Sequence, residues 1–331
     1  MLQVEHLTRR YGPVTAVDDL SFEISDDGVY GFLGPNGAGK STTMNIMTGC
    51  LSATSGTVRI SGYDIYEQPK EAKRRIGYLP EQPPLYLGET PAEYLRFVGE
   101  AKGLRGDALR REIEDAIEET GIGEMRSRRI DALSKGYRQR VGIAQALLGS
   151  PKAIILDEPT VGLDPIQIIE IRELIKELGK QHTVIFSSHI LSEVQTICDQ
   201  VLIIANGKLA AFDRPEALEK RQLAPNEILV VPDGSTKEVM AILESLPHIT
   251  HIQAEEEGVH PTLRIRTDVG DLYDLSCAIF LTFAQAKKPL LELRLEKASL
   301  EQVFLQLTES VQEASPQEAG NGTKQKEAKP I

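Results

Sequence analysis

Residues 34–42 of this 331-residue chain read Gly-Pro-Asn-Gly-Ala-Gly-Lys-Ser-Thr, a complete G-x-x-x-x-G-K-[ST] loop. Its glycines let the backbone curl so that successive N–H groups point at one anion. The loop follows an apolar segment typical of a buried parallel strand (29–33) and precedes a helix-compatible segment (42–48). A phosphate would therefore lie on a helix N-terminus. The pattern predicts an α/β fold that binds a nucleoside triphosphate.

Individual positions of the loop have separate chemical roles. Lys40 can reach the β- and γ-phosphates, and the Ser41 hydroxyl can ligate Mg²⁺. The alternative is a glycine-rich turn that matches by chance, but strand, lysine and serine are all in register. The predicted ATP-binding residues of the loop are Gly34, Pro35, Asn36, Gly37, Ala38, Gly39, Lys40, Ser41 and Thr42.

Charge and composition exclude several classes of protein. The formal net charge of −12 argues against a broad nucleic-acid interface, which needs a basic face. The three cysteines (Cys50, Cys198 and Cys277) contain no C-x-x-C pair, so neither a disulfide framework nor a zinc site is expected. The longest apolar runs, such as 278–284, fall far short of the ~20 residues that a spanning helix needs, so no membrane span is predicted.

The length predicts one large domain and a smaller one. We expect the nucleotide-binding domain at 1–221, with buried strands at 153–156 and 183–186 and a strand–turn–strand around Asn206-Gly207. Residues 222–311 alternate as β-α-β-β-α-β with a closing helix, which predicts a small split-βαβ domain. Residues 312–331 lack periodicity and predict a disordered tail.

Two further segments carry candidate catalytic groups. The apolar strand 153–156 ends in Asp157 and Glu158, and ligands of open α/β sheets lie beyond the carboxyl ends of the strands. Asp157 suits the surroundings of Mg²⁺, and Glu158 can polarise a water as general base. The next strand leads to His189, which could hydrogen-bond the γ-phosphate or the water. The alternatives are a solvated acidic turn and a structural histidine; the other five histidines are assigned to that structural class.

Placed together, these segments resemble the ATP-binding subunit of ABC transporters over roughly 1–225. The resemblance implies a P-loop NTPase of the ABC ATPase type, with a mixed sheet core and a helical subdomain at about 84–140. Tyr11 matches the aromatic residue that stacks on adenine, with Val17 beside it. Gln82 matches the glutamine that joins Mg²⁺ and water to the membrane partner, so the Mg²⁺ ligands would be Ser41, Gln82 and Asp157. Asp164 matches the acidic loop at the dimer interface.

The octapeptide Leu-Ser-Lys-Gly-Tyr-Arg-Gln-Arg at 133–140 is similar to the signature of that family, normally Leu-Ser-Gly-Gly-Gln. Lys135 replaces the first glycine and Tyr137 the glutamine, whereas Ser134 and Gly136 are retained. In the family this motif caps the γ-phosphate bound by the opposite subunit, at a helix N-terminus that favours anions. Lys135 adds a cation there, which predicts a tighter closed dimer.

The signature variant, the phrase Gly-Leu-Asp-Pro-Ile-Gln at 162–167 and the appended domain resemble bacterial exporter ATPases of the ABC-2 type, and within them the gliding-motility group. The resemblance implies a dimer that hydrolyses two ATP with Mg²⁺, bound to membrane permease subunits at the cytoplasmic face of the plasma membrane, with no nucleic acid as partner. Two alternatives stay open: a soluble ABC-type ATPase that acts on ribosomes or DNA, and a regulatory nucleotide-binding module in which Glu158 is catalytically idle.

Overall fold

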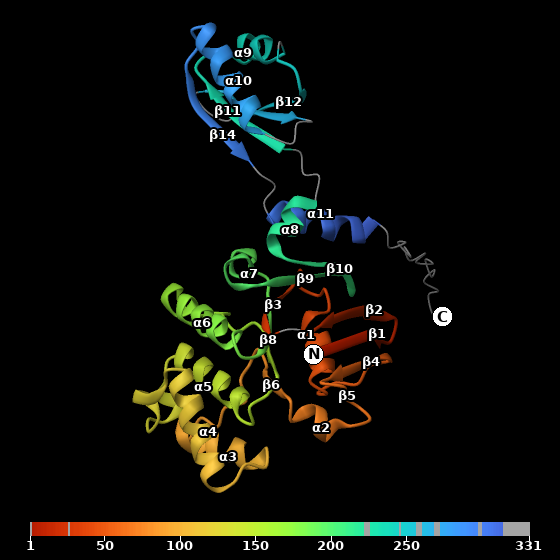
Figure 1. The fold of residues 1–331 in the computed structure, drawn as a ribbon, viewed down its shortest axis with the longest axis vertical. Helices are drawn as coiled ribbons and strands as arrows, with labels where there is room; N and C mark the ends of the chain where they lie inside the picture. Colours follow the sequence, from red (N-terminus) through yellow and green to blue (C-terminus); the bar gives the residue numbers. More distant parts are fainter. Residues whose placement is uncertain are drawn as a thin grey trace, which may run out of the picture.

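A computed structural model describes residues 2–25, 27–221, 226–244, 246–255, 260–267, 272–296 and 300–313. Its first part contains two sheets (Figure 1). The antiparallel sheet has the order β2-β1-β4-β5, with β1 Leu2–Tyr11, β2 Val14–Ile24, β4 Ser55–Ile60 and β5 Tyr63–Asp64. The second has the order β10-β9-β3-β8-β7-β6, with β3 Gly28–Leu33, β6 Ile76–Leu79, β7 Ala153–Leu156, β8 Thr183–Ser188, β9 Gln200–Ala205 and β10 Lys208–Asp213.

The second sheet is parallel except for β10, and both of its faces are covered. Side chains alternate between two cores, as the period of a strand requires. Ile155 faces the antiparallel sheet and α1 (Lys40–Met47), whereas Ile154 and Leu156 face the layer of helices on the other side. Burial on both faces explains why β7 is apolar throughout and why the middle of β8, residues 184–186, is an uninterrupted apolar run. This sheet holds the loop at 34–42 between two packed layers.

Helices cover the second face. They are α3 Pro91–Ala101, α4 Gly106–Glu119, α5 Lys135–Leu147, α6 Pro165–Leu178 and α7 Leu191–Ile197, and the short α8 (Pro215–Arg221) adds Leu218 to the same core. The short α2 (Pro69–Lys73) instead buries Ala72 in the core on the other face. The helical segment 91–120, within the subdomain expected at about 84–140, is not one continuous helix. The chain breaks between α3 and α4, where Gly103 takes a left-handed φ of 95° that a continuous helix does not allow.

The predicted strand–turn–strand is confirmed by β9 and β10, which pair antiparallel across Asn206 and Gly207. Both turn residues have positive φ, 49° and 77°, as a type I′ turn requires. The Asn-Gly dipeptide between two strand segments therefore predicted this hairpin correctly.

Residues 226–296 form a separate sheet with its own core. The elements are β11 Asn226–Pro232, α9 Thr236–Leu243, β12 Ile249–Glu255, β13 Thr262–Thr267, α10 Leu272–Gln285 and β14 Leu290–Glu296. The four strands pair antiparallel in the order β12-β13-β11-β14, and α9 and α10 pack on one face around Val239 and Ile279. The predicted β-α-β-β-α-β order is confirmed. Figure 1 shows this unit at the end of the molecule opposite to α3 and α4.

The closing helix, α11 (Leu300–Glu313), was expected within the small domain at 222–311, but it packs on the first part of the chain. Leu300 and Val303 are fully buried in the core that covers the second face of the parallel sheet. Figure 1 shows α11 beside α8 and β9. The helix packs there because its apolar side chains complete the hydrophobic core on that face of the parallel sheet. Of the predicted tail, Gln312 and Glu313 end α11, and 314–331 lies outside the described residues.

A search of the described residues finds no helix with the length and apolar character that a membrane crossing requires.

Candidate functional site

The loop after β3 is held between two neighbouring backbones. Gly39 caps α1 with φ 101°, and a Cβ at this position would lie 2.4 Å from the carbonyl oxygen of Ala16. A Cβ on Gly34 would lie 2.5 Å from the carbonyl oxygen of Ile204. Real side chains cannot approach a backbone oxygen so closely, so β2 and β9 require glycine at both positions. The tight packing explains the curled loop that the motif predicted.

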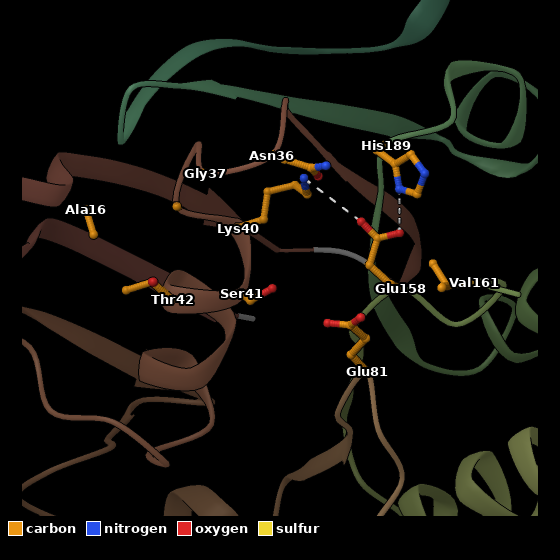
Figure 2. A pocket seen from close by; sticks show the side chains of 11 residues that line it. Ala16, Asn36, Gly37, Lys40, Ser41, Thr42, Glu81, Glu158, Val161 and His189 are labelled. Atoms are coloured by element: carbon orange, nitrogen blue, oxygen red, sulfur yellow. Dashed lines mark hydrogen bonds and ion pairs between the residues drawn. The ribbon is translucent and has the colours of Figure 1, made fainter.

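A cavity of about 350 Å³ opens beside this loop (Figure 2). Its residues come from five separate segments of the chain: β2, the loop with α1, the turn after β6, and the ends of β7 and β8. The lining residues are Ala16, Asn36, Gly37, Gly39, Lys40, Ser41, Thr42, Glu81, Glu158, Val161 and His189. Because β3, β7 and β8 are parallel, their carboxyl ends meet at this edge of the sheet.

Lys40 is buried, with 7% of its side chain exposed. Its Nζ donates hydrogen bonds to the carbonyl oxygens of Gly34 at 2.7 Å and Pro35 at 3.3 Å, and lies 4.0 Å from Glu158 Oε1. Burial lowers the pKa of Lys40, and the carboxylates of Glu158 and Asp157 oppose that shift. A bound phosphate would add negative charge beside this ammonium and favour its protonated form.

Asp157 is buried and accepts two hydroxyl hydrogen bonds at one oxygen. Ser187 Oγ donates to Asp157 Oδ1 at 2.6 Å and Ser41 Oγ donates to it at 3.3 Å. A carboxylate and a hydroxyl are hard oxygen ligands, which suit Mg²⁺. No group of three or more His, Cys, Asp or Glu side chains that could hold a metal occurs among the described residues.

Glu158 has an unusual backbone and a paired side chain. Its φ is 49°, a left-handed value that is uncommon for a residue with a Cβ, and its N–H donates to Ser187 Oγ at 2.7 Å. Its Oε2 lies 2.9 Å from His189 Nδ1 (Figure 2). Because an ionised carboxylate only accepts hydrogen bonds, Nδ1 carries the proton in this pair. The structure therefore brings together Glu158, His189 and Lys40, as the sequence predicted.

Five of the residues predicted to bind ATP are not among those that line this cavity: Gly34, Pro35 and Ala38 of the loop, and Tyr11 and Val17 outside it. Val17 is fully buried in the core, and its neighbour Ala16 lines the cavity instead, because successive residues of a strand face opposite sides. Tyr11 is 45% exposed, and the Arg9 guanidinium lies 4.7 Å from its ring centre. The stacking of Tyr11 on adenine stays a prediction.

The predicted Mg²⁺ ligand Gln82 is exposed and does not line the cavity, whereas the preceding Glu81 does. The sequence analysis named Gln82 in this segment, whereas the neighbouring Glu81 is the residue that faces the cavity. The role of Gln82 stays a prediction.

The signature residues lie at the start of α5, away from the cavity of their own chain. Ser134 caps the helix, and its Oγ accepts from Tyr137 N–H at 3.3 Å, which leaves the hydroxyl proton free to be donated. Gly136 follows within the first turn. The Lys135 ammonium lies over Gly162 of its own chain, where a Cβ would be 2.2 Å from Nζ.

Asp164 caps α6, and its Oδ1 accepts from Gln167 N–H at 2.9 Å. It does not line the cavity either, although Val161 of the same loop does. Several residues that support the site escaped the sequence analysis, above all Ser187, Thr160 and Glu193. Serine, threonine and glutamate are common on protein surfaces, and no local spacing marks these three.

The fold and the glycine-rich loop define a P-loop nucleoside triphosphatase. A family profile described as "ABC transporter" matches residues 17–161. The chain is 32% identical over 312 residues to the linearmycin resistance ATP-binding protein LnrL of Bacillus subtilis, covering 93% of this chain and 98% of LnrL. It is 33% identical over 309 residues to the bacitracin transport ATP-binding protein BcrA of Bacillus licheniformis, covering 93% and 97%. The chain belongs to the ATP-binding proteins of ABC transporters, and it is an ABC-type ATPase.

Solved structures agree with this assignment. An ATP-binding subunit of an ABC transporter is 31% identical with a TM-score of 0.61, covering 67% of this chain and 92% of that one. The dimeric structure of MJ0796, a bacterial ABC transporter cassette, is 24% identical with a TM-score of 0.59, covering 65% and 98%, and shares the fold.

Proposed function

We propose that this protein is the ATP-hydrolysing subunit of a bacterial exporter of the ABC-2 type, which works as a dimer around two ATP molecules. The observation that carries the proposal is the Glu158–His189 pair at 2.9 Å beside the phosphate loop, while Ser134 lies outside its own cavity. One chain thus supplies a base and a phosphate cradle but lacks a cap on the γ-phosphate. A second chain completes the site with its own Ser134, Lys135 and Gly136.

The residues of the chain divide the work of hydrolysis. Lys40 and the loop N–H groups hold the phosphates, and Ser41 and Asp157 would hold Mg²⁺, which neutralises the developing charge. Glu158 takes the proton of the attacking water, and His189 fixes the orientation of that carboxylate. Closure on ATP and reopening after hydrolysis would move the membrane subunits at the cytoplasmic face of the membrane.

Support for export comes from the relatives. LnrL is named for linearmycin resistance and BcrA for bacitracin transport, and both match across the C-terminal unit as well as the ATPase part. Their names favour an exporter over an ATPase that acts on ribosomes or DNA. Membership of the gliding-motility group stays a prediction.

We infer a docking surface for the membrane partner in the segment that follows Gln82 and in α3. Tyr86, Leu87 and Phe97 expose 51%, 48% and 50% of their surfaces, and the rings of Tyr86 and Phe97 are 5.1 Å apart. An exposed aromatic cluster of this kind is typical of a protein interface. It supports docking of the permease against the region of α3.

The test uses Glu158→Gln in the full chain. This variant should bind ATP, hydrolyse it about 10²–10⁴-fold more slowly than wild type, and elute as a dimer with ATP and Mg²⁺ in size-exclusion chromatography. A monomer under these conditions would contradict the shared-site scheme. Co-purification of the wild-type chain from membranes then identifies the partner, and recovery with ribosomes or DNA in its place would overturn the exporter assignment.

A further inference from the structure

A fully buried carboxylate lies directly behind the catalytic pair. Glu193 of α7 is 0% exposed, and its Oε2 accepts hydrogen bonds from Thr160 Oγ1 at 2.9 Å and Ser188 Oγ at 2.8 Å. Thr160 follows Glu158 by two residues, and Ser188 immediately precedes His189. One oxygen atom therefore joins the two loops that carry the catalytic side chains.

The burial of this charge is costly for stability alone. An ionised carboxylate loses its hydration on burial, and an apolar side chain of similar size usually serves a core as well or better. Glu193 is matched by one cation, since Arg172 Nη2 lies 3.2 Å from its Oε1. Both hydroxyl partners belong to the catalytic loops, so the arrangement fixes those loops relative to each other more than it stabilises the core.

Arg172 connects this carboxylate to the helix that begins at Asp164, the residue proposed for the dimer interface. It lies on α6, the helix that Asp164 caps. On the same helix Glu170 pairs with Arg140 Nη2 of the signature helix α5 at 2.8 Å. Helix α6 thus contacts the signature helix through one residue and Glu193 through another.

We propose that Glu193 is a positioning residue for ATP hydrolysis, which holds the Glu158 and His189 loops in register and ties both to α6 through Arg172. The inference rests on the proposed function, because it assigns to Glu193 the support of the catalytic pair. The carboxylate does not reach the nucleotide cavity and acts only through its neighbours.

The central variant is Glu193→Gln, which keeps the size of the side chain and replaces one acceptor oxygen by an NH₂ donor. The amide has one acceptor oxygen, so it can keep the hydrogen bonds from the two hydroxyls or the contact with Arg172, but not both. We expect kcat to fall at least tenfold, while the affinity for a fluorescent ATP analogue changes by less than about twofold. Glu173→Gln makes the same chemical change at an exposed position of α6 and should leave kcat unchanged.

Ser188→Ala provides an independent arm that removes one hydroxyl and leaves the buried charge in place. It should also lower kcat without changing nucleotide affinity. Combined with Glu193→Gln, it should add less than its effect alone, because both changes weaken the same link between Glu193 and the segment that carries His189. Melting temperatures are recorded for each variant, and kcat is measured well below them.

The outcomes separate the two proposals. The role of Glu193 would be overturned if the wild type hydrolysed ATP and either Glu193→Gln or Ser188→Ala were as active as the wild type. That result would leave the ATPase assignment intact. A loss of kcat that parallels a loss of nucleotide affinity would mark Glu193 as merely structural and would also overturn it. Absence of ATP hydrolysis by the wild type, or a monomeric Glu158→Gln variant with ATP, would overturn the proposed function itself.

Discussion

Ser187 offers the sharpest test of how Glu158, the proposed catalytic carboxylate, is held in position. It is fully buried, and its Oγ both accepts from Glu158 N–H at 2.7 Å and donates to Asp157 Oδ1 at 2.6 Å. The left-handed φ of 49° at Glu158 costs about 1–2 kcal/mol. The two hydrogen bonds of Ser187 offset this strain, because a bond to a charged group stabilises by about 1.5–3 kcal/mol and a neutral one by about 1 kcal/mol.

Ser187→Ala removes both bonds and leaves the part-buried Glu158 N–H without its hydrogen-bond partner. We expect the free energy of unfolding to fall by about 3 kcal/mol, the sum of the lost carboxylate bond and the orphaned donor. The freed backbone of Glu158 should also relax and displace its carboxylate. Since a misplacement of about 1 Å can cost about 10²-fold in rate, kcat should fall by one to two orders of magnitude.

Urea unfolding followed by circular dichroism measures the first effect, and steady-state ATP hydrolysis measures the second. Ser192→Ala is the matched control, because it makes the same change at an exposed position of α7 and should stay within about 0.5 kcal/mol of wild type. Our account of Glu158 would be refuted if Ser187→Ala unfolded at the wild-type urea concentration and hydrolysed ATP at the wild-type rate.

Three further predictions concern the loop, the signature and a buried lysine. Gly39→Ala should abolish nucleotide binding in equilibrium titration, because its Cβ would clash with the carbonyl oxygen of Ala16 at 2.4 Å; binding at wild-type affinity would contradict the loop geometry. Lys135→Gly should weaken the ATP-bound dimer most at low salt, and a dimer of unchanged stability across a salt series would exclude a role for this cation. Lys102 donates to the carbonyl oxygen of Leu148 at 2.6 Å, and burial lowers its pKa to about 8. Between that value and the ordinary pKa of 10.5 the unfolded chain holds a proton that the folded chain lacks, so stability rises with pH. Relative to Lys102→Met, wild type should therefore gain about 1 kcal/mol in urea unfolding between pH 8 and 9, and a flat difference would argue against the lowered pKa.

The phosphate loop and the buried strands could be read from the sequence because their signals are local. The spacing of Gly34, Gly39, Lys40 and Ser41 sets the conformation of a single loop, and continuous apolar runs mark strands that are covered on both faces. The meeting of Glu158 with the loop was also predictable, since parallel strands of one sheet end at one edge.

Other features depended on contacts between distant segments. The sequence could not tell whether Ala16 or Val17 faces the cavity, because a shift of one residue turns a strand over. The apolar stripe of α11 predicted a helix but carried no information about which of two cores it completes. Glu193 has an ordinary sequence context, and its burial is visible only in the folded chain.

The sequence by itself determined which chemical groups this chain offers: a phosphate loop, two carboxylates at the end of an apolar strand, and a histidine after the next strand. The types and spacing of neighbouring residues were sufficient to predict each of them. The tertiary structure decided how those parts work together. It set the 2.9 Å contact between Glu158 and His189, and it placed a buried Glu193 behind them. The physical reason is that hydrogen bonds and burial act over a few ångströms in space, whereas these residues lie some thirty positions apart in the chain.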